Sequence, residues 1–248
     1  MPLQEELESQ GNWLFRYRSF LPLVILLIGG TVYLWGDSGE AFRWLQEKRG
    51  QTGFELACLA VSLVGSLVRL YTVAHAPVNT SGRNTSEGQV ADSLNTTGIY
   101  SAVRHPLYVG NFIMWLGVCL LTANVWFVVI FCLLYALYYE RIMYAEEQFV
   151  RRKFGEQYTQ WGDEVPAFFP DWSRFVAPKH PFNWRKVLRS EKSTTVNLFA
   201  VFCLFDLGGY YLRSAEAVNL ILIGLLCLSL LAYVIIKVLE KNSNVLNV

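Results

Sequence analysis

Six apolar stretches run along the chain, and polar segments separate them. They cover residues 19–36, 53–73, 107–122, 125–145, 195–213 and 217–237. A helix needs about 20 apolar residues to cross the hydrocarbon core of a bilayer, and fewer where the membrane is locally thin. The pattern therefore predicts an all-α, polytopic membrane protein with about six transmembrane helices.

Two links between these stretches are so short that they fix the arrangement of the helices on either side. Thr122-Ala-Asn124 joins the third stretch to the fourth, and Arg213-Ser-Ala-Glu216 joins the fifth to the sixth. Helices joined by so few residues lie antiparallel, so each pair is predicted to form a hairpin. Longer polar segments then divide the chain into three predicted regions. These are an N-terminal two-span region (1–76), a core with a polar loop and the central hairpin (77–170), and a basic linker with the C-terminal hairpin (171–248).

The composition agrees with a membrane protein and excludes several other classes. Apolar residues make up 53% of the chain and charged residues 17%, whereas a soluble domain has about 25% charged residues. The net charge is +1, so no overall field attracts nucleic acid. The five cysteines all lie in apolar stretches, where they are expected to face the core or lipid. The sequence therefore predicts neither a disulfide framework nor a metal site.

The basic residues predict which side of the membrane each segment faces. If both termini lie on one side, only four of the 21 lysines and arginines lie on the other, and these are Arg43, Lys48, Arg49 and Arg213. The side that holds the other 17 is predicted to be cytoplasmic by the positive-inside rule. Both termini, the loop before Arg104 and the segment 146–170 are then cytoplasmic.

Strong acids and bases gather at the two ends of the central hairpin. Pro106 suits the first turn of a helix, which places Arg104 and His105 beside unpaired backbone N–H groups and the positive end of the helix dipole. Such a helix end binds anions, and an arginine adds a forked donor for carboxylate or phosphate. Alternatively, Arg104 only reaches lipid phosphates and His105 fills the interface.

Counting through the hairpin brings these groups together with two carboxylates. Arg104 lies 20 residues before Asn124, and Glu147 lies 23 residues after it. Because a helix rises about 1.5 Å per residue, Arg104 and His105 are predicted to face Glu146 and Glu147 across the mouth of the hairpin. The alternative for Glu147 is an ordinary helical pair with Arg151, four residues later.

A few other polar residues have two interpretations each. Tyr100 and Tyr108 suit an aromatic belt at the interface, but they also suit the wall of a cofactor pocket. Arg69 lies near the end of the second stretch, where its side chain is expected to reach the interface. Asp206, in the fifth stretch, is either a buried functional acid or a helix-packing group, and the sequence does not assign a role to the last two spans.

The order of these residues resembles the isoprenylcysteine carboxyl methyltransferase family. The resemblance rests on Thr97-Gly98-x-Tyr100-x-x-x-Arg104-His105-Pro106-x-Tyr108-x-Gly110, then the hairpin, then Glu146-Glu147, then Phe154-Gly-Glu-x-Tyr158 and Val165-Pro166. The related phospholipid N-methyltransferases share the Arg-His-Pro and Glu-Glu elements. The resemblance covers residues 97–170, and the chain departs from the eukaryotic enzymes in its long loop 77–97 and its two additional spans after Pro170.

The resemblance implies an integral membrane methyltransferase that uses S-adenosyl-L-methionine. In that family the cofactor occupies a pocket open to the cytoplasm, and the lipid substrate enters from the bilayer. The resemblance assigns the cofactor pocket to Gly98, Tyr100, His105, Pro106, Tyr108, Gly110, Glu146 and Glu147. It assigns the position nearest the transferred methyl group to Arg104 and Glu147, which makes these two the predicted catalytic residues.

The predicted reaction is methyl transfer to a membrane lipid headgroup on the cytoplasmic face. A carboxylate or phosphate acceptor is already ionised and needs no general base, and Arg104 with the basic segment 179–192 favours such an anion. We therefore prefer O-methylation of an anionic headgroup, either a lipid phosphate such as that of lipid A or a carboxylate. The alternatives are an isoprenylcysteine carboxylate, a phospholipid amine, and a transporter or scaffold with no enzymatic activity. The expected partners are the bilayer and a lipid or lipidated substrate, and the sequence does not predict an oligomeric state.

Overall fold

The computed structural model describes residues 2–35, 51–77, 91–212, 217–243 and 245–246. Its helices are α1 (Leu3–Tyr17), α2 (Leu21–Trp35), α4 (Gln51–His75), α5 (Pro106–Leu120), α6 (Val125–Phe154), α7 (Glu156–Glu164), α8 (Trp184–Leu212) and α9 (Leu220–Asn242), with short 3-10 turns η1 (Ile99–Ser101) and η2 (Trp172–Arg174). The described residues contain no strand, and Gly98 and Val176 form an isolated bridge. The prediction of an all-α protein is confirmed.

Four of the described helices, α4, α6, α8 and α9, are long and apolar enough to cross a membrane. The pair α1 and α2 adds a fifth candidate if it is taken as one span, although the two helices bend by 74° at their junction. The apolar helix α5 has 15 residues, and so it rises only about 22 Å. The multi-pass prediction is confirmed, but the number of six spans is not, because α5 is too short to count by length alone.

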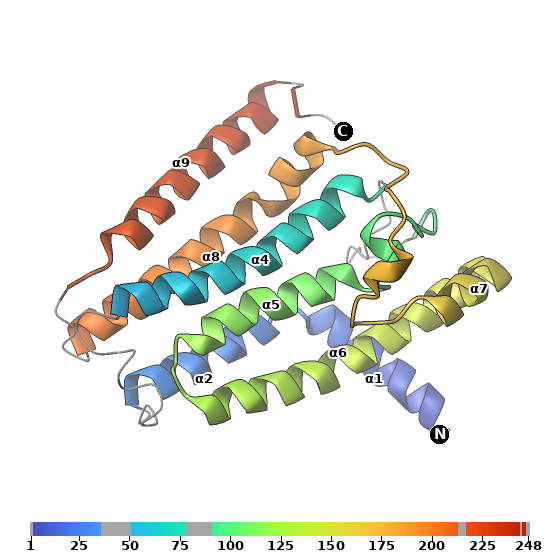
Figure 1. The fold of residues 1–248 in the computed structure, drawn as a ribbon, viewed down its shortest axis with the longest axis horizontal. Coiled ribbons are helices and arrows are strands. Elements are labelled where there is room, and N and C mark those ends of the chain that lie inside the picture. The colour runs from blue at the N-terminus through green and yellow to red at the C-terminus, as the bar shows by residue number, and fades with distance from the viewer. Residues whose placement is uncertain (1, 36–50, 78–90, 213–216, 244, 247–248) are drawn as a thin grey trace.

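Five helices form a closed ring around the centre of the molecule. Following the contacts around the bundle, α4 packs on α5, α5 on α6, α6 on α2, α2 on α8, and α8 on α4. The helix α9 packs on the outer side of α8, as Figure 1 shows at the top of the bundle. The C-terminal hairpin therefore has two different parts, since α8 belongs to the ring and α9 lies outside it.

The central hairpin turns where the sequence predicts. Asn124 is the residue before α6, and its side chain accepts a hydrogen bond from the backbone N–H of Phe127 at 2.9 Å. Ala123 adopts a positive φ of 49° in this turn. The cap satisfies one of the free N–H groups of the first turn of α6, and the α5–α6 pair is antiparallel as expected.

The helices α4 and α5 approach closely because small residues line their contact. A Cβ atom added to Gly65 would lie 2.5 Å from the carbonyl oxygen of Gly110 and 2.9 Å from the Cα of Met114. A Cβ atom added to Gly110 would lie 2.9 Å from the carbonyl oxygen of Gly65. Backbone atoms cannot move aside as a side chain can, so these two glycines set the distance between the helices.

Replacing Gly65 by alanine is expected to lower the stability of the folded protein by about 1–3 kcal/mol, because the added methyl group overpacks the α4–α5 contact. Gly53→Ala is the matched control on the same helix, since a Cβ atom there would meet nothing within 4 Å. Thermal unfolding in detergent measures both variants. Equal midpoints for Gly65→Ala and Gly53→Ala would contradict the close contact.

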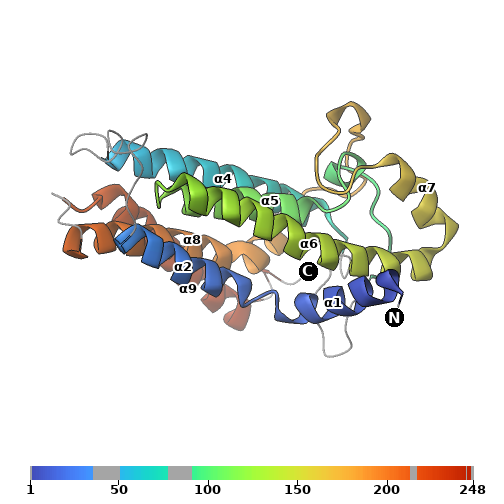
Figure 2. The same cartoon turned by 90° about the horizontal axis from the view of Figure 1, so that it is seen from below.

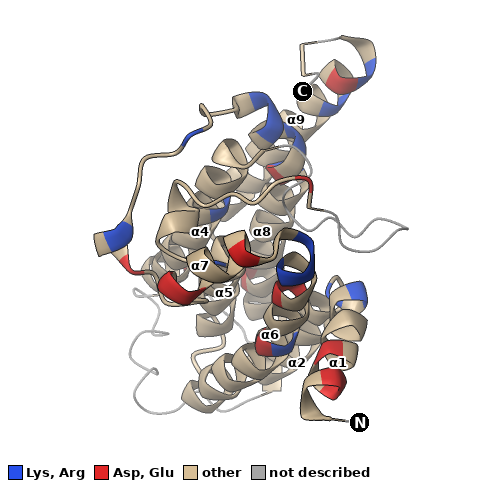
Figure 3. Ribbon diagram, turned by 90° about the vertical axis from the view of Figure 1, so that its right-hand side faces the viewer, with Lys and Arg blue, Asp and Glu red and all other residues tan. Residues whose placement is uncertain are grey.

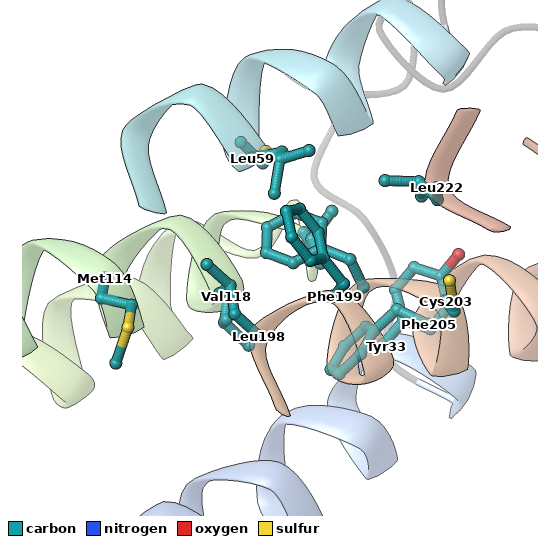
Figure 4. Close-up of a cluster of buried hydrophobic side chains, with 12 residues drawn as sticks. Tyr33, Leu59, Met114, Val118, Leu198, Phe199, Cys203, Phe205 and Leu222 are labelled. Carbon is teal, nitrogen blue, oxygen red and sulfur yellow. The ribbon is translucent and has the colours of Figure 1, made fainter. Parts of the chain in front are cut away.

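A hydrophobic cluster joins the C-terminal hairpin to the rest of the ring. Figure 4 shows Phe199 and Phe205 of α8 beside Leu59 of α4, Val118 of α5 and Leu222 of α9, and all of these side chains are buried. Tyr33 of α2 packs against Phe205 with ring centroids 5.1 Å apart. The predicted span 195–213 is therefore an integral part of the core.

The side chain of Arg69 does not reach the interface, which corrects the expectation for this residue. It lies between helices, where it donates to Glu191 of α8 through Nε at 3.1 Å and Nη2 at 2.8 Å. A third donor, Nη1, bonds Asn111 of α5. The buried carboxylate of Glu191 provides a partner inside the protein, so the guanidinium gains nothing by extending to the membrane surface.

Asp206 is a buried group on the side of the bundle away from the central hairpin's open end. One of its carboxylate oxygens accepts a hydrogen bond from the backbone N–H of Asn219 at 3.0 Å, and the Asn219 side chain donates to Glu55 at 3.0 Å. The three residues join α4, α8 and the start of α9. This arrangement supports the helix-packing interpretation of Asp206.

The start of α1 and the end of α9 lie at the same end of the bundle as α7 (Figure 1). The helix α1 lies along the C-terminal half of α6 (Figure 2), where Arg152 makes an ion pair with Glu8 at 2.6 Å. Charged residues gather at this end, over α7, the start of α8 and the end of α6 (Figure 3). The four basic residues predicted for the opposite side all lie outside the described residues, as does most of the loop 77–97.

Candidate active site at the mouth of the helical hairpin

Backbone hydrogen bonds hold the segment before α5 against the segment after α7. The N–H groups of Arg104 and His105 donate to the carbonyl oxygens of Pro166 and Ala167 at 2.9 and 3.2 Å. These bonds explain why Val165-Pro166 belongs to the same motif as Arg104-His105, although the two are far apart in sequence. The predicted site residues therefore stand on a backbone that is fixed from both sides.

Gly98 begins this segment with a conformation that favours glycine. Its φ is 64°, and its N–H donates to the carbonyl oxygen of Val176 at 2.9 Å. The hydroxyl of Ser101 then accepts from the N–H of Val176 at 2.8 Å. Gly98 thus contributes a turn that ties the site to the chain before α8.

Helix α5 starts as predicted, with His105 as its N-terminal flanking residue and Pro106 in the first turn. Helix α6 is long enough to return to the same level and extends to Phe154. The structure therefore brings Arg104 and His105 of one element opposite Glu146 and Glu147 of the other, as counting through the hairpin predicts.

Glu147 is the centre of the charge cluster. Its Oε1 atom lies 2.9 Å from Nε of Arg104 and 2.9 Å from Nε2 of His105. The side chains of Arg104 and Glu147 are each 19% exposed, so the pair is largely withdrawn from water. Glu147 therefore forms its ion pair with Arg104 and not with Arg151. The guanidinium of Arg151 lies over the ring of Tyr158, 5.9 Å from the ring centre.

Glu146 forms the second carboxylate of the cluster and joins it to the N-terminal helices. It accepts a hydrogen bond from the Tyr108 hydroxyl at 2.8 Å and lies 3.6 Å from Nδ1 of His105. Arg18, between α1 and α2, approaches Glu146 at 3.9 Å and Tyr108 at 3.5 Å. The bend between α1 and α2 thus places a basic residue directly in the site.

Tyr158 closes the site from α7. Its hydroxyl is buried beside Glu147 but makes no hydrogen bond of good geometry within the described residues. Burial, followed by the charge of Glu147, raises the pKa of Tyr158 well above its ordinary value, and burial, followed by the charge of Glu146, does the same to the pKa of Tyr100. Both phenols are protonated at neutral pH and are available as hydrogen-bond donors.

A second contact from α7 orients the arginine. The Nη1 group of Arg104 donates to the backbone carbonyl of Gly162, and the indole N–H of Trp161 donates to the carbonyl of Tyr100 at 3.3 Å. Arg104 is therefore held between a carboxylate and a carbonyl, in one orientation. The same contacts position α7 over the mouth of the hairpin.

These residues line one large cavity of about 1070 Å³ that lies inside the ring of five helices. The predicted site residues that line it are Tyr100, Arg104, His105, Pro106, Tyr108, Glu146 and Glu147. Gly98 and Gly110 do not line it, since Gly98 makes the turn against Val176 and Gly110 packs against α4. The cavity draws residues from all three predicted regions of the chain.

The lining changes from polar to apolar along three helices that enter the bundle from the same end. At the start of α2 it passes from Arg18 and Ser19 to Leu23 and Leu26. On α5 it passes from Tyr108 and Asn111 to Met114 and Val118, and on α8 from Lys186 and Ser190 to Leu198 and Val201. A cavity graded in this way suits an amphiphile whose polar group lies at the charged end.

Several lining residues were not identified from the sequence. They are Arg18, Asn111, Tyr158, Glu191, Thr194 and Asn197, and Arg69 was assigned to the interface. Apart from Asn111, which lies on α5 itself, these residues lie on segments whose packing against the hairpin is not visible in a local pattern. The polar positions that recur on one face of 190–197 were the available signal for α8.

The fold and the site define a class of protein, a polytopic helical membrane protein with a charged cavity between its spans. Residues 54–157 match the phospholipid methyltransferase family. The matched segment comprises most of α4, all of α5 and α6 and the start of α7, which are the elements that carry most of the charge cluster.

Known proteins with similar sequences include methyltransferases and metal-resistance proteins. The chain is 30% identical over 117 residues to protein-S-isoprenylcysteine O-methyltransferase of Schizosaccharomyces pombe, covering 47% of this chain and 50% of that protein. It is 33% identical over 78 residues to protein-S-isoprenylcysteine O-methyltransferase B of Arabidopsis thaliana, covering 31% and 39%. It is 33% identical over 124 residues to the nickel-cobalt-cadmium resistance protein NccN of Alcaligenes xylosoxydans xylosoxydans, covering 50% and 55%.

The chain spans about half the length of the curated relatives NccN and the Schizosaccharomyces pombe methyltransferase that it matches. No solved structure matches it significantly. The family match over residues 54–157 and the isoprenylcysteine relatives show that this part of the chain is similar to the phospholipid methyltransferase family and to its isoprenylcysteine methyltransferases. The resemblance seen in residues 97–170 is thereby confirmed.

Proposed function

We propose that the protein transfers a methyl group from S-adenosyl-L-methionine to an anionic group of a membrane lipid. The observation that carries the proposal is the convergence of Arg104, His105, Glu146 and Glu147 on one cavity that becomes apolar toward its interior. A membrane boundary is a costly place for four such groups unless they bind a polar ligand.

The chemistry of the site fits the cofactor. The amino-acid part of S-adenosylmethionine carries a carboxylate and an ammonium group. The site offers His105 and the N-terminus of α5 for the first, and Glu146 and Glu147 for the second. When the cofactor binds, its two charged groups can replace the present ion-pair partners of these side chains, so that no buried charge is left without a partner. Tyr158 adds a buried hydroxyl, and Tyr100 and Trp161 line the cavity with rings that suit an adenine.

When bound, this cofactor supplies an activated methyl group on a sulfonium centre. The residues of the chain orient both reactants and keep water out of the cavity mouth. Arg104 is held by Glu147 and by the carbonyl of Gly162, so it is fixed in place to bind an anionic acceptor. A carboxylate or phosphate needs no general base, whereas an amine would need Glu147 in that role.

The graded cavity supports an amphiphilic acceptor. Arg104 lines the polar end together with Lys186 and Arg189 of the basic segment, which favours an anion. We prefer a lipid phosphate, such as that of lipid A, or a carboxylate. The names of the isoprenylcysteine relatives favour a prenylcysteine carboxylate as the second candidate. The family description leaves a phospholipid amine as the third.

The same charge distribution supports a cytoplasmic site. The segment 141–192 holds ten of the 21 lysines and arginines, and it includes α7 and the start of α8 at the charged end of the bundle (Figure 3). By the positive-inside rule this end, with the cavity mouth and both chain ends, faces the cytoplasm.

The chemistry of the product tests the acceptor. Purified protein in liposomes of a total lipid extract is incubated with methyl-labelled cofactor, and the labelled product is identified by mass spectrometry and treated with mild base. A carboxyl methyl ester releases labelled methanol, whereas an N-methyl group does not. We expect label on an anionic lipid. Label on an amine headgroup would overturn the preferred acceptor. If neither a lipid nor a lipidated substrate were labelled, the result would favour the alternative of a transporter or scaffold.

A further inference from the structure

Helix α8 lies outside the segment that matches the family, yet it forms one wall of the cavity. Ser190, Thr194 and Asn197 all line it from α8. Their spacing of four and then three residues places them on one face of the helix. This helix therefore adds to the cavity a row of neutral polar side chains that the family segment alone does not contain.

The three side chains make no hydrogen bond within the described part of the chain. Serine and threonine in a membrane helix often bond the carbonyl four residues before, and Thr195 does so with Glu191 at 3.0 Å. The neighbouring Thr194 does not, although it is the same residue type on the same helix. Asn197 is exposed on the apolar part of α8, where neighbouring side chains and hydrocarbon offer its amide no hydrogen bond. The cavity is the place where these groups find a partner.

The depth of the three residues indicates what that partner is. Glu191, which holds Arg69, marks the charged level on α8. Thr194 and Asn197 lie about 4.5 and 9 Å further along the helix, in the direction in which the cavity becomes apolar at Leu198 and Val201. Neutral hydrogen-bonding groups thus stand between a charged level and an apolar level.

We propose that Thr194 and Asn197 donate hydrogen bonds to the ester carbonyl groups of a diacyl anionic lipid, and that α8 therefore selects the acceptor. Ser190 extends the same wall toward the charged level. An ester-linked lipid carries neutral carbonyls between its anionic group and its chains, at the level that Thr194 and Asn197 occupy. A prenylated cysteine has only a thioether and hydrocarbon there. The proposal rests on the proposed function, because the lipid is a methyl acceptor only if the protein is a methyltransferase. Lipid binding by α8 itself does not depend on the cofactor.

The test compares two lipids that differ only in these carbonyls. Native mass spectrometry measures binding of ester-linked phosphatidylglycerol, ether-linked phosphatidylglycerol and farnesylcysteine to the purified full-length protein without cofactor. The wild type is expected to bind the ester lipid about fivefold more tightly than the ether lipid, which corresponds to one net hydrogen bond. Thr194→Val and Asn197→Leu are each expected to reduce this ratio toward one. Thr195→Val, the matched control, is expected to keep it.

Three results would overturn the proposal. They are equal binding of the ester and ether lipids by the wild type, an ester preference that survives both Thr194→Val and Asn197→Leu, and tighter binding of farnesylcysteine than of either diacyl lipid. Thermal unfolding of each variant shows that it is folded before its lipid affinity is compared. A wild type that shows the ester preference but binds no S-adenosylmethionine would contradict the proposed function and not this inference.

Discussion

Glu147→Gln is expected to lower the affinity for S-adenosylmethionine by about 100-fold or more, because the variant removes the charge that faces both Arg104 and His105. The two cationic groups share one oxygen of Glu147, at 2.9 Å each. The amide of glutamine keeps the size of the side chain but leaves no carboxylate for the ammonium group of the cofactor. Isothermal titration of the purified protein with the cofactor measures the loss.

Glu140→Gln is the matched control for this variant. Glu140 lies on the same helix, α6, about two turns before Glu147, and it is exposed. The control removes the same charge from the same helix and is expected to leave cofactor affinity unchanged. Equal affinities for the two variants would remove Glu147 from the binding site.

Arg69→Met is expected to lower the stability of the protein by about 3–5 kcal/mol, because it leaves the carboxylate of Glu191 buried without its partner. Glu191 is 4% exposed, and the pair is bidentate across α4 and α8. A loss of this size corresponds to a midpoint of thermal unfolding that is lower by about 10 °C. Circular dichroism of the protein in detergent follows the transition.

Two further variants show whether the loss comes from the lone charge. Arg69→Met combined with Glu191→Met is expected to recover most of the stability, since an apolar pair of similar size replaces the ion pair. Arg152→Gln breaks another bidentate pair between distant segments, with Glu8, but Arg152 is 59% exposed. Its midpoint is expected to change by less than about 2 °C. A large drop in Arg152→Gln, or none in Arg69→Met, would contradict this account of the interior.

The sequence predicts the hairpin and its charge cluster well because both follow from local features. Apolar length, a three-residue link and the rise of a helix per residue are enough to set Arg104 opposite Glu147. The start of α5 follows from Pro106. The class of protein and the helical fold need no more than the six apolar stretches and the low charge content.

The remaining parts of the site depend on packing between segments far apart in sequence. Arg69 and Glu191 are separated by 122 residues. No local pattern indicates that an arginine in one span pairs with an acid in a segment whose composition is mainly basic. Arg18 enters the site through the 74° bend between α1 and α2, where the pattern shows a single span. Gly110, which the motif assigns to the cofactor, instead allows α5 to approach α4.

These long-range contacts give the C-terminal hairpin a role that its sequence does not state. Helix α8 closes the ring, holds Arg69 in place and lines the cavity from its charged mouth to its apolar interior. Helix α9 packs on the outer side of α8, where apolar residues such as Leu228 and Leu231 are exposed and suit contact with lipid. The family segment and α8 together therefore form one cavity, with the charged cluster at one end and a wall that changes from polar to apolar along its length.

Binding of S-adenosyl-L-methionine to the purified protein tests the central claim most directly. Isothermal titration in lipid nanodiscs is expected to show one saturable site for which S-adenosylhomocysteine competes. His105→Ala and Glu147→Gln are expected to weaken this site strongly, while Glu140→Gln leaves it intact. Absence of binding by the folded wild type, or binding that neither His105→Ala nor Glu147→Gln weakens, would contradict the assignment of the hairpin mouth as the methyl-donor site.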